Sequence, residues 1–125
     1  MNPSNQKYQS YHKLTLYQKA RELVVLTYKL TSKFPREELY VLVPQMRRAA
    51  ISTVANLVEG YAKHSKREFA RFLDISIGSA TELEIYFDIS LELKYSDKMD
   101  LEKAFSLLLE VKKLLYSFQR SLKES

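Results

Sequence analysis

The sequence predicts an all-α protein, an up-down-up-down antiparallel four-helix bundle. The chain has 125 residues, the size of one domain, and 46% of them are hydrophobic, which is enough for a core. It contains only 2 Gly and 3 Pro, too few for the many tight turns of a sheet protein. Apolar residues instead recur at three- and four-residue spacing through four long segments. We expect the bundle to span residues 13–122, after a polar, disordered arm at residues 1–12.

The first two helices are bounded by polar residues and prolines. Thr15 and Gln18 have the spacing of a capping box, so the first helix should begin there. It should end before Pro35, because the residue before a proline avoids helical geometry, and Pro35 can then open a short helical turn. Its apolar face carries Leu16, Ala20, Leu23, Val24, Thr27 and Tyr28. Pro44 suits the first position of the second helix, where a missing N–H costs nothing, and this helix should reach about residue 63.

The third helix has two apolar faces. Ser65 and Glu68 form its capping box, and a helix from there to about Leu93 would be roughly 40 Å long. One face carries Phe69, Leu73, Ile77, Ala80, Leu83 and Phe87, and the second carries Phe72, Ile75, Ile89 and Leu93. Because a helix with two apolar faces packs on two sides, the second face should contact another subunit. Gly78 costs about 1 kcal/mol relative to alanine, so another backbone should approach it, in the bundle or across a subunit contact.

The fourth helix should be capped by Ser96 or Asp97. Its apolar stripe runs from Leu101 to Phe118, and the helix frays over residues 121–125. The links between all four helices are short, so neighbouring helices should be antiparallel.

The antiparallel order separates charge along the bundle. The chain has a formal net charge of +5. Segments 12–22, 58–71 and 112–125 meet at one end and hold eleven basic and four acidic residues, a balance of +7. Segments 29–43 and 84–103 form the other end and hold six basic and eight acidic residues, a balance of −2. One end of the bundle should therefore be strongly basic and the other end weakly acidic.

The basic end has two interpretations. Lys66, Arg67 and Arg71 crowd the start of the third helix, where cations oppose the helix macrodipole. This pattern fits an anion-binding surface, most directly for nucleic acid. It also fits salt bridges to neighbouring helices or subunits with a solvated remainder. On the first interpretation the candidate nucleic-acid contacts are Lys63, Lys66, Arg67, Arg71, Lys112 and Lys113.

A polar line follows one face of the second helix. It consists of Arg48, Ser52, Asn56, Glu59 and Lys63. These side chains could bind a partner, or they could form a hydrogen-bonded seam that fixes the register between helices. Tyr61 and Tyr86 carry the same ambiguity, because they could stack on bases or pack at a helix rim.

Catalytic constellations are absent from the sequence. There is no Cys, and His12 and His64 lack any helical His-x-x-x-His or Glu-x-x-His spacing. No Gly-rich phosphate loop or serine-nucleophile motif occurs. We therefore expect no enzyme activity, no metal and no cofactor. No apolar run is long enough for a membrane helix, and the start resembles no secretory signal, so we expect a cytoplasmic protein.

Five ordered motifs carry a family resemblance. They are residues 34–40 (FPREELY), 45–52 (QMRRAAIS), 56–60 (NLVEG), 65–73 (SKREFARFL) and 78–84 (GSATELE). Over about residues 14–120 the chain resembles the four-helix-bundle proteins encoded by intervening sequences in bacterial large-subunit ribosomal RNA genes. The accessory protein of diversity-generating retroelements is similar to this family.

The resemblance implies a ring of five subunits, a homopentamer, in a bacterial cytoplasm. For the retroelement branch it implies a basic surface that contacts RNA or DNA and a reverse transcriptase. The polar signature of the family falls on Arg47, Arg48, Asn56, Glu59, Ser79 and Glu82. These positions coincide with the polar line and the small-residue patch around Gly78, which favours a structural role for them.

Two functions follow as hypotheses. The preferred one is a non-enzymatic oligomeric scaffold that binds RNA or DNA phosphates through the basic end. The alternative is a purely structural oligomer that presents a platform to another protein and has no nucleic-acid role.

Overall fold

The computed structural model describes residue 11 and residues 14–124, which form four long α-helices and one short 3₁₀ helix. These are α2 (Thr15–Thr31), η1 (Arg36–Glu38), α3 (Leu42–Tyr61), α4 (Lys66–Glu92) and α5 (Lys98–Glu124). Those residues contain no strand, so the predicted all-α class is confirmed. The expected arm lies outside the described residues except for Tyr11, whose ring packs edge-to-face on Tyr17 at 5.0 Å.

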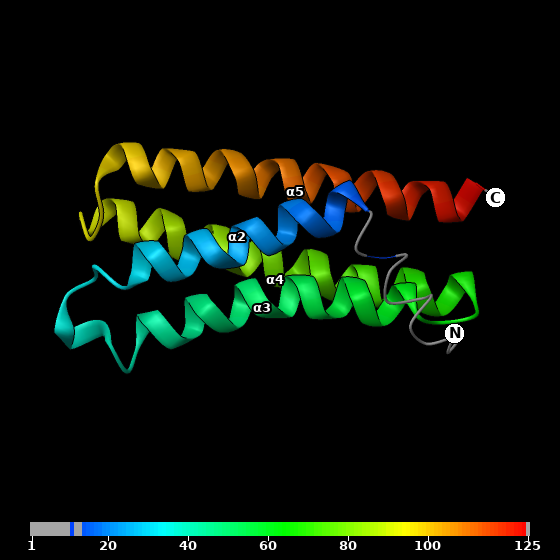
Figure 1. Ribbon diagram of the computed structural model, residues 1–125, viewed down its shortest axis with the longest axis horizontal. Coiled ribbons are helices and arrows are strands. Elements are labelled where there is room, and N and C mark those ends of the chain that lie inside the picture. Colours follow the sequence, from blue (N-terminus) through cyan, green and yellow to red (C-terminus); the bar gives the residue numbers. More distant parts are fainter. Residues whose placement is uncertain (1–10, 12–13, 125) are drawn as a thin grey trace.

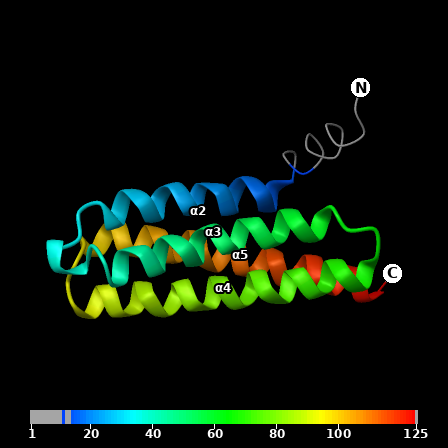
Figure 2. The ribbon, with the colours of Figure 1, turned by 90° about the horizontal axis from the view of Figure 1, so that it is seen from below.

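Successive helices run in opposite directions along an elongated bundle (Figure 1). α2 packs against α3 and α5, and α4 packs against the same two helices. Seen from below, α3 and α4 lie side by side over most of their length (Figure 2). The α3–α4 turn therefore lies at the same end of the bundle as the start of α2 and the end of α5.

One apolar core joins the four helices. Its largest fully buried side chains are Phe87, Leu23, Met46, Leu57, Leu73, Leu83, Leu101, Leu108 and Leu115. Full burial of each contributes about 1.5–3 kcal/mol, which determines the face that each helix turns inward. All six residues expected on the inward face of the third helix are buried. Tyr28, expected inward on the first helix, is instead 39% exposed.

The predicted helix caps have mixed outcomes. The Ser65 hydroxyl accepts a hydrogen bond from the Glu68 N–H at 3.0 Å, and the Asp97 carboxylate accepts one from the Met99 N–H at 3.0 Å. The Thr15 cap is wrong, because α2 has Leu14 at its cap position without a side-chain hydrogen bond. The chain already turns before Thr15, since the Leu14 N–H donates to the Tyr11 carbonyl at 3.1 Å.

Two helix limits also differ from the expected ones. α2 ends at Thr31, and the next residues turn through tighter bonds, such as the Phe34 N–H to the Thr31 carbonyl at 3.1 Å. α3 begins at Leu42, so Pro44 is its third residue and not its first. Pro44 still lies in the first turn, where N–H groups have no partner inside the helix.

The close backbone approach occurs at Gly60 and not at Gly78. A Cβ on Gly60 would lie 2.7 Å from the Phe72 Cβ, so a side chain here would collide with α4. A Cβ on Gly78 would meet nothing within 4 Å, and this residue is exposed. The expectation of a close contact at Gly78 within the bundle is therefore wrong.

Candidate nucleic-acid interface

Exposed cations gather at the α3–α4 turn. Lys63 follows the end of α3, Lys66 and Arg67 are the first two residues of α4, and Arg71 lies one turn further on. All four side chains are exposed. The Ser65 cap fixes the first turn of α4 and with it the positions of the first two cations. The structure thus brings together four of the six predicted nucleic-acid contacts.

Two of these cations lie over one aromatic ring. The Lys63 ammonium is 5.2 Å from the centre of the Phe72 ring, and the Arg71 guanidinium carbon is 4.6 Å from it. Phe72 is half-buried. Arg71 also contacts Glu68 at 3.5 Å, in an ion pair that is exposed on both sides. The ring holds two flexible cationic side chains near fixed positions at the surface.

Lys112 has a different environment from the one expected of a phosphate contact. Its ammonium donates to the Glu84 carboxylate across the α4–α5 contact at 3.1 Å, and its side chain is only 17% exposed. From the sequence, Lys112 is expected at the basic end of the bundle and Glu84 at the other end. The antiparallel packing of α4 on α5 instead brings the two side chains together. We therefore remove Lys112 from the candidate surface. Lys113 is exposed and forms no ion pair within the described part of the chain.

The polar line on α3 forms a hydrogen-bonded seam against α4. The hydroxyl oxygens of Ser52 and Ser79 are 2.7 Å apart, and the Asn56 amide donates to the Ser52 carbonyl at 2.9 Å. Deeper in the same contact, the Ser76 hydroxyl donates to the Thr53 carbonyl at 2.6 Å. The structure thus places Ser79 in the contact between the helices, where its bond to Ser52 helps to fix register, and Asn56 supports Ser52 from within α3.

The other four seam residues lie outside this contact. The Arg47 Nε donates to the Thr31 hydroxyl at 3.0 Å, so this side chain joins α3 to α2. Glu82 is exposed and accepts a hydrogen bond from the Tyr86 hydroxyl at 2.8 Å, which raises the pKa of Tyr86. Arg48 and Glu59 are both exposed. Of the six positions predicted to form the polar seam, only Asn56 and Ser79 therefore take part in it.

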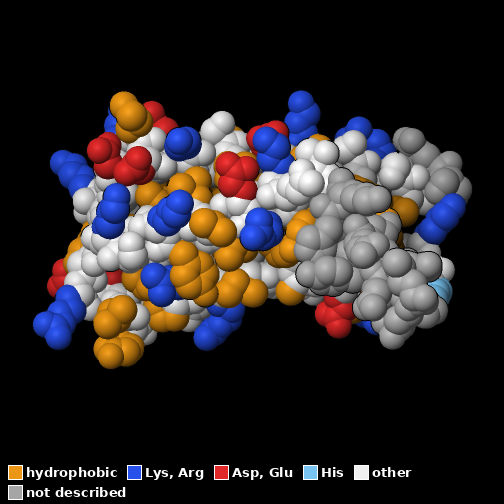
Figure 3. Space-filling view, in the orientation of Figure 1, with side chains coloured by type: hydrophobic (Ala, Val, Ile, Leu, Met, Phe, Trp, Pro, Cys, Tyr) orange, Lys and Arg blue, Asp and Glu red, His pale blue; other side chains and the backbone are white. Residues whose placement is uncertain are grey.

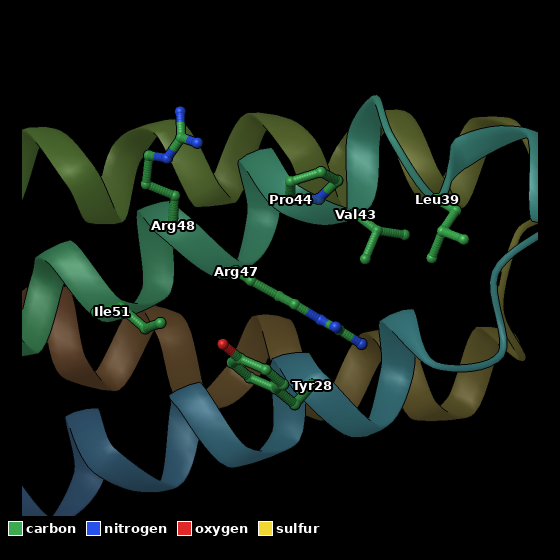
Figure 4. Close-up of a pocket in the computed structure, with 7 residues that line it drawn as sticks. All are labelled: Tyr28, Leu39, Val43, Pro44, Arg47, Arg48 and Ile51. Atoms are coloured by element: carbon green, nitrogen blue, oxygen red, sulfur yellow. The ribbon is translucent and has the colours of Figure 1, made fainter.

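A groove between α2 and α3 was not predicted from the sequence. It has a volume of about 410 Å³ and is lined by Tyr28, Leu39, Val43, Pro44, Arg47, Arg48 and Ile51. Arg47 extends across it over the Tyr28 ring, at 4.4 Å from the ring centre (Figure 4). In the surface view, hydrophobic side chains gather between α2 and α3 with Lys and Arg among them (Figure 3). The lining is apolar with two arginines and no acid.

The outer face of α4 is acidic, in contrast to the α2–α3 groove with its two arginines. Ile75, Ile85 and Ile89 on this face are 42%, 54% and 41% exposed. Between Phe72 and Leu93 the chain has five acidic residues and no Lys or Arg. The acids that are exposed on α4 in this stretch are Asp74, Glu82, Asp88 and Glu92. Ile75, Ile89 and Leu93 of the predicted second apolar face lie here and are exposed among the described residues, whereas Phe72, the fourth member, lies under Lys63 and Arg71.

The described residues offer neither a metal site nor a membrane-spanning helix. Within residues 11 and 14–124, no three His, Asp or Glu side chains converge in a way that could hold a metal ion. None of the described helices is both long and apolar enough to cross a membrane.

The fold and the site together define a small all-α bundle with a cationic end. The family model of the 23S rRNA-intervening sequence proteins matches residues 12–117, and the chain therefore belongs to that family. The fold is similar to the crystal structure of a protein of unknown function from the S23 ribosomal protein family of Bacteroides thetaiotaomicron. That similarity has a TM-score of 0.76 at 24% identity and covers 84% of this chain and 98% of the other. A comparison with curated proteins finds no match.

Proposed function

We propose that this protein is a non-enzymatic oligomeric scaffold that binds RNA or DNA phosphates through the basic end of the bundle. The observation that carries the proposal is the group of exposed cations at the α3–α4 turn. The proposed contacts at this turn are Lys63, Lys66, Arg67 and Arg71. Lys113 lies away from the turn, because its neighbour Lys112 pairs with Glu84, and Gln119, closer to the end of α5, hydrogen-bonds to Asp74. The name of the family, 23S rRNA-intervening sequence protein, refers to an RNA, which supports a nucleic-acid partner.

Intramolecular salt bridging does not account for the positions of Arg67 and Arg71. Arg67 forms no ion pair within the described residues, and the pair of Arg71 with Glu68 is exposed and long. Exposed pairs contribute little, about 0.2–1 kcal/mol. The cations also oppose the macrodipole of α4, so their position costs stability in the isolated chain. Bound phosphates would reverse that cost, because they would neutralise the cations at the helix start.

Matched substitutions at the two ends of the bundle test the proposal. Arg67→Ala and Arg71→Ala should each weaken binding of mixed-sequence RNA and of duplex DNA several-fold at low salt. Lys33→Ala and Lys103→Ala, which remove exposed lysines at the other end, should leave both affinities unchanged. Equal effects at both ends, or undetectable binding by the unsubstituted chain, would contradict it. In a pull-down, partners that survive nuclease treatment would favour the protein-platform alternative.

We also propose that copies assemble side by side, with the outer face of α4 of one copy in the α2–α3 groove of the next. Both surfaces are apolar and exposed, and their charges are complementary, since Arg47 and Arg48 line the groove and the charged residues of α4 between Phe72 and Leu93 are all acidic. Two different surfaces in contact make a head-to-tail interface, which closes into a ring when the rotation allows it. A ring of five, as the family resemblance implies, would repeat the basic end five times on one side.

Paired substitutions distinguish this interface from a two-fold one. Ile85→Asp damages the α4 face and Ile51→Asp damages the groove, so each variant alone should remain monomeric in light scattering. A mixture of the two should form 1:1 pairs and nothing larger, because one undamaged interface remains. Leu109→Asp, at a position on α5 that is 54% exposed, should assemble normally. Normal assembly of Ile51→Asp alone, or a monomeric unsubstituted chain at micromolar concentration, would overturn the interface.

A further inference from the structure

We propose that Phe72, Arg71 and Lys63 form a stacking site for an unpaired nucleobase, so that the basic end prefers single-stranded RNA or DNA to duplex. This inference rests on the proposed function, because it names the class of nucleic acid that the same surface takes. The observation behind it is the pair of cations over one ring, at 4.6 Å for Arg71 and 5.2 Å for Lys63.

The ring has a fixed position because α3 and α4 approach closely beneath it. Gly60 has no side chain, and a Cβ there would lie 2.7 Å from the Phe72 Cβ. The buried side chain of Phe69, one turn earlier on α4, also lies against Gly60. Phe72 is half-buried, so its ring is anchored on one side and reaches the surface on the other. The Arg71 guanidinium therefore lies on a rigid support.

A planar guanidinium on a ring presents a flat surface on which a base can stack. Proteins that bind single strands use aromatic rings and Arg planes in this way, next to cations that follow the backbone. The Arg71 side chain is 58% exposed, so its outer surface is accessible. The exposed Lys66 and Arg67 lie within two turns of Phe72 on the same helix and can neutralise flanking phosphates. A duplex would offer the phosphates but not the base faces, which are stacked inside it.

Tyr61 is less suited to this role, although the sequence suggested it. Its ring packs edge-to-face on Phe69, with ring centres 5.8 Å apart, and the Lys and Arg side chains that the structure places over a ring at this turn lie over Phe72. Stacking strength is similar for all four bases, because each has a flat aromatic face. We therefore expect weak sequence preference at this site.

The test compares three probes on the full-length chain: a single-stranded oligonucleotide of about 12 nucleotides, the same strand with central abasic sites, and the matching duplex. The single strand should bind about tenfold more tightly than either of the others. Arg71→Lys keeps the charge and removes the plane, and Phe72→Leu keeps apolar volume and removes the ring. Each should weaken single-strand binding about tenfold and leave duplex binding within twofold.

Arg71→Lys decides the test if Phe72→Leu disturbs folding, because Arg71 is a surface residue and circular dichroism can verify its fold. Arg67→Ala serves as the phosphate control and should weaken all three probes by a similar factor. Equal affinity for the single strand, the abasic strand and the duplex would overturn the stacking site while leaving the proposed function intact. Unchanged single-strand affinity in Arg71→Lys would also overturn it. Failure of all three probes to bind would contradict the proposed function itself.

Discussion

The hydroxyl oxygens of Ser52 on α3 and Ser79 on α4 lie 2.7 Å apart and join the two helices at the middle of their contact. The Asn56 amide donates to the same Ser52 hydroxyl at 3.0 Å, so three polar side chains satisfy one another. Ser79→Ala should lower the free energy of unfolding by about 1 kcal/mol, because the Ser52 hydroxyl loses one partner. Urea unfolding measures this. The double variant with Ser52→Ala should cost less than the sum of the two single changes, and strict additivity would contradict the linked seam.

The two glycines should respond oppositely to alanine. Gly60→Ala should lower the free energy of unfolding by about 1–3 kcal/mol, because the new Cβ would collide with Phe72 across the α3–α4 contact. Gly78→Ala should raise it by about 0.5–1 kcal/mol, since nothing lies within 4 Å and alanine favours the helix. Thermal unfolding of the two variants side by side measures both. A stabilised Gly60→Ala chain would show that the helices do not approach as closely as the structure indicates.

Lys112 should matter for stability and not for nucleic-acid binding. Its ion pair with Glu84 joins α4 to α5 and is largely shielded from solvent on the Lys112 side. Lys112→Met should lower the free energy of unfolding by about 1 kcal/mol, because it leaves the Glu84 carboxylate without its donor. Affinity for RNA should be unchanged, whereas Arg67→Ala should lower it. A loss of RNA affinity in Lys112→Met with an unaltered unfolding curve would reverse these assignments.

Tyr95 should make the protein lose stability at high pH. Its hydroxyl donates to the Glu38 carboxylate at 2.7 Å and thereby ties the α4–α5 loop to η1. This hydrogen bond, with burial, raises the pKa of Tyr95 from 10.0 to about 12. As the pH rises, Tyr95 therefore loses its proton in the unfolded chain before it does so in the folded protein. The stabilisation by this hydrogen bond is fully present below pH 10 and is lost as the pH rises towards 12. Tyr95→Phe should show a shallower decline of stability between pH 10 and 12, and identical declines would contradict the hydrogen bond.

The helices and their inward faces could be predicted because they depend on local patterns. The third helix was expected from Ser65 to about Leu93, and α4 runs over Lys66–Glu92 with all six expected core residues buried. The apolar period and the Ser65 cap are readable along the chain without knowledge of its neighbours. The class of the fold follows directly from four such segments.

The Thr15 cap and the start of α3 are local errors, whereas the errors that affect the site concern contacts between helices. The pairing of Lys112 with Glu84 depends on the register of two antiparallel helices, which no local pattern sets. The close approach at Gly60 also depends on how α3 and α4 pack, so the local sequence does not reveal it. A glycine near the end of a helix can equally be interpreted as a signal that ends the helix. The α2–α3 groove requires three segments to be placed in space, so Arg47 and Tyr28 could not be assigned to it in advance.

The salt dependence of RNA binding tests the central claim most directly. Affinity for a single-stranded RNA should be measured from low to physiological salt on the unsubstituted chain. If the four exposed cations at the α3–α4 turn neutralise phosphates, log affinity should fall linearly with log salt with a slope of roughly −3 per copy. Arg67→Ala should reduce that slope by roughly 0.7. A slope near zero, or no detectable binding at low salt, would contradict a phosphate-binding role for the basic end.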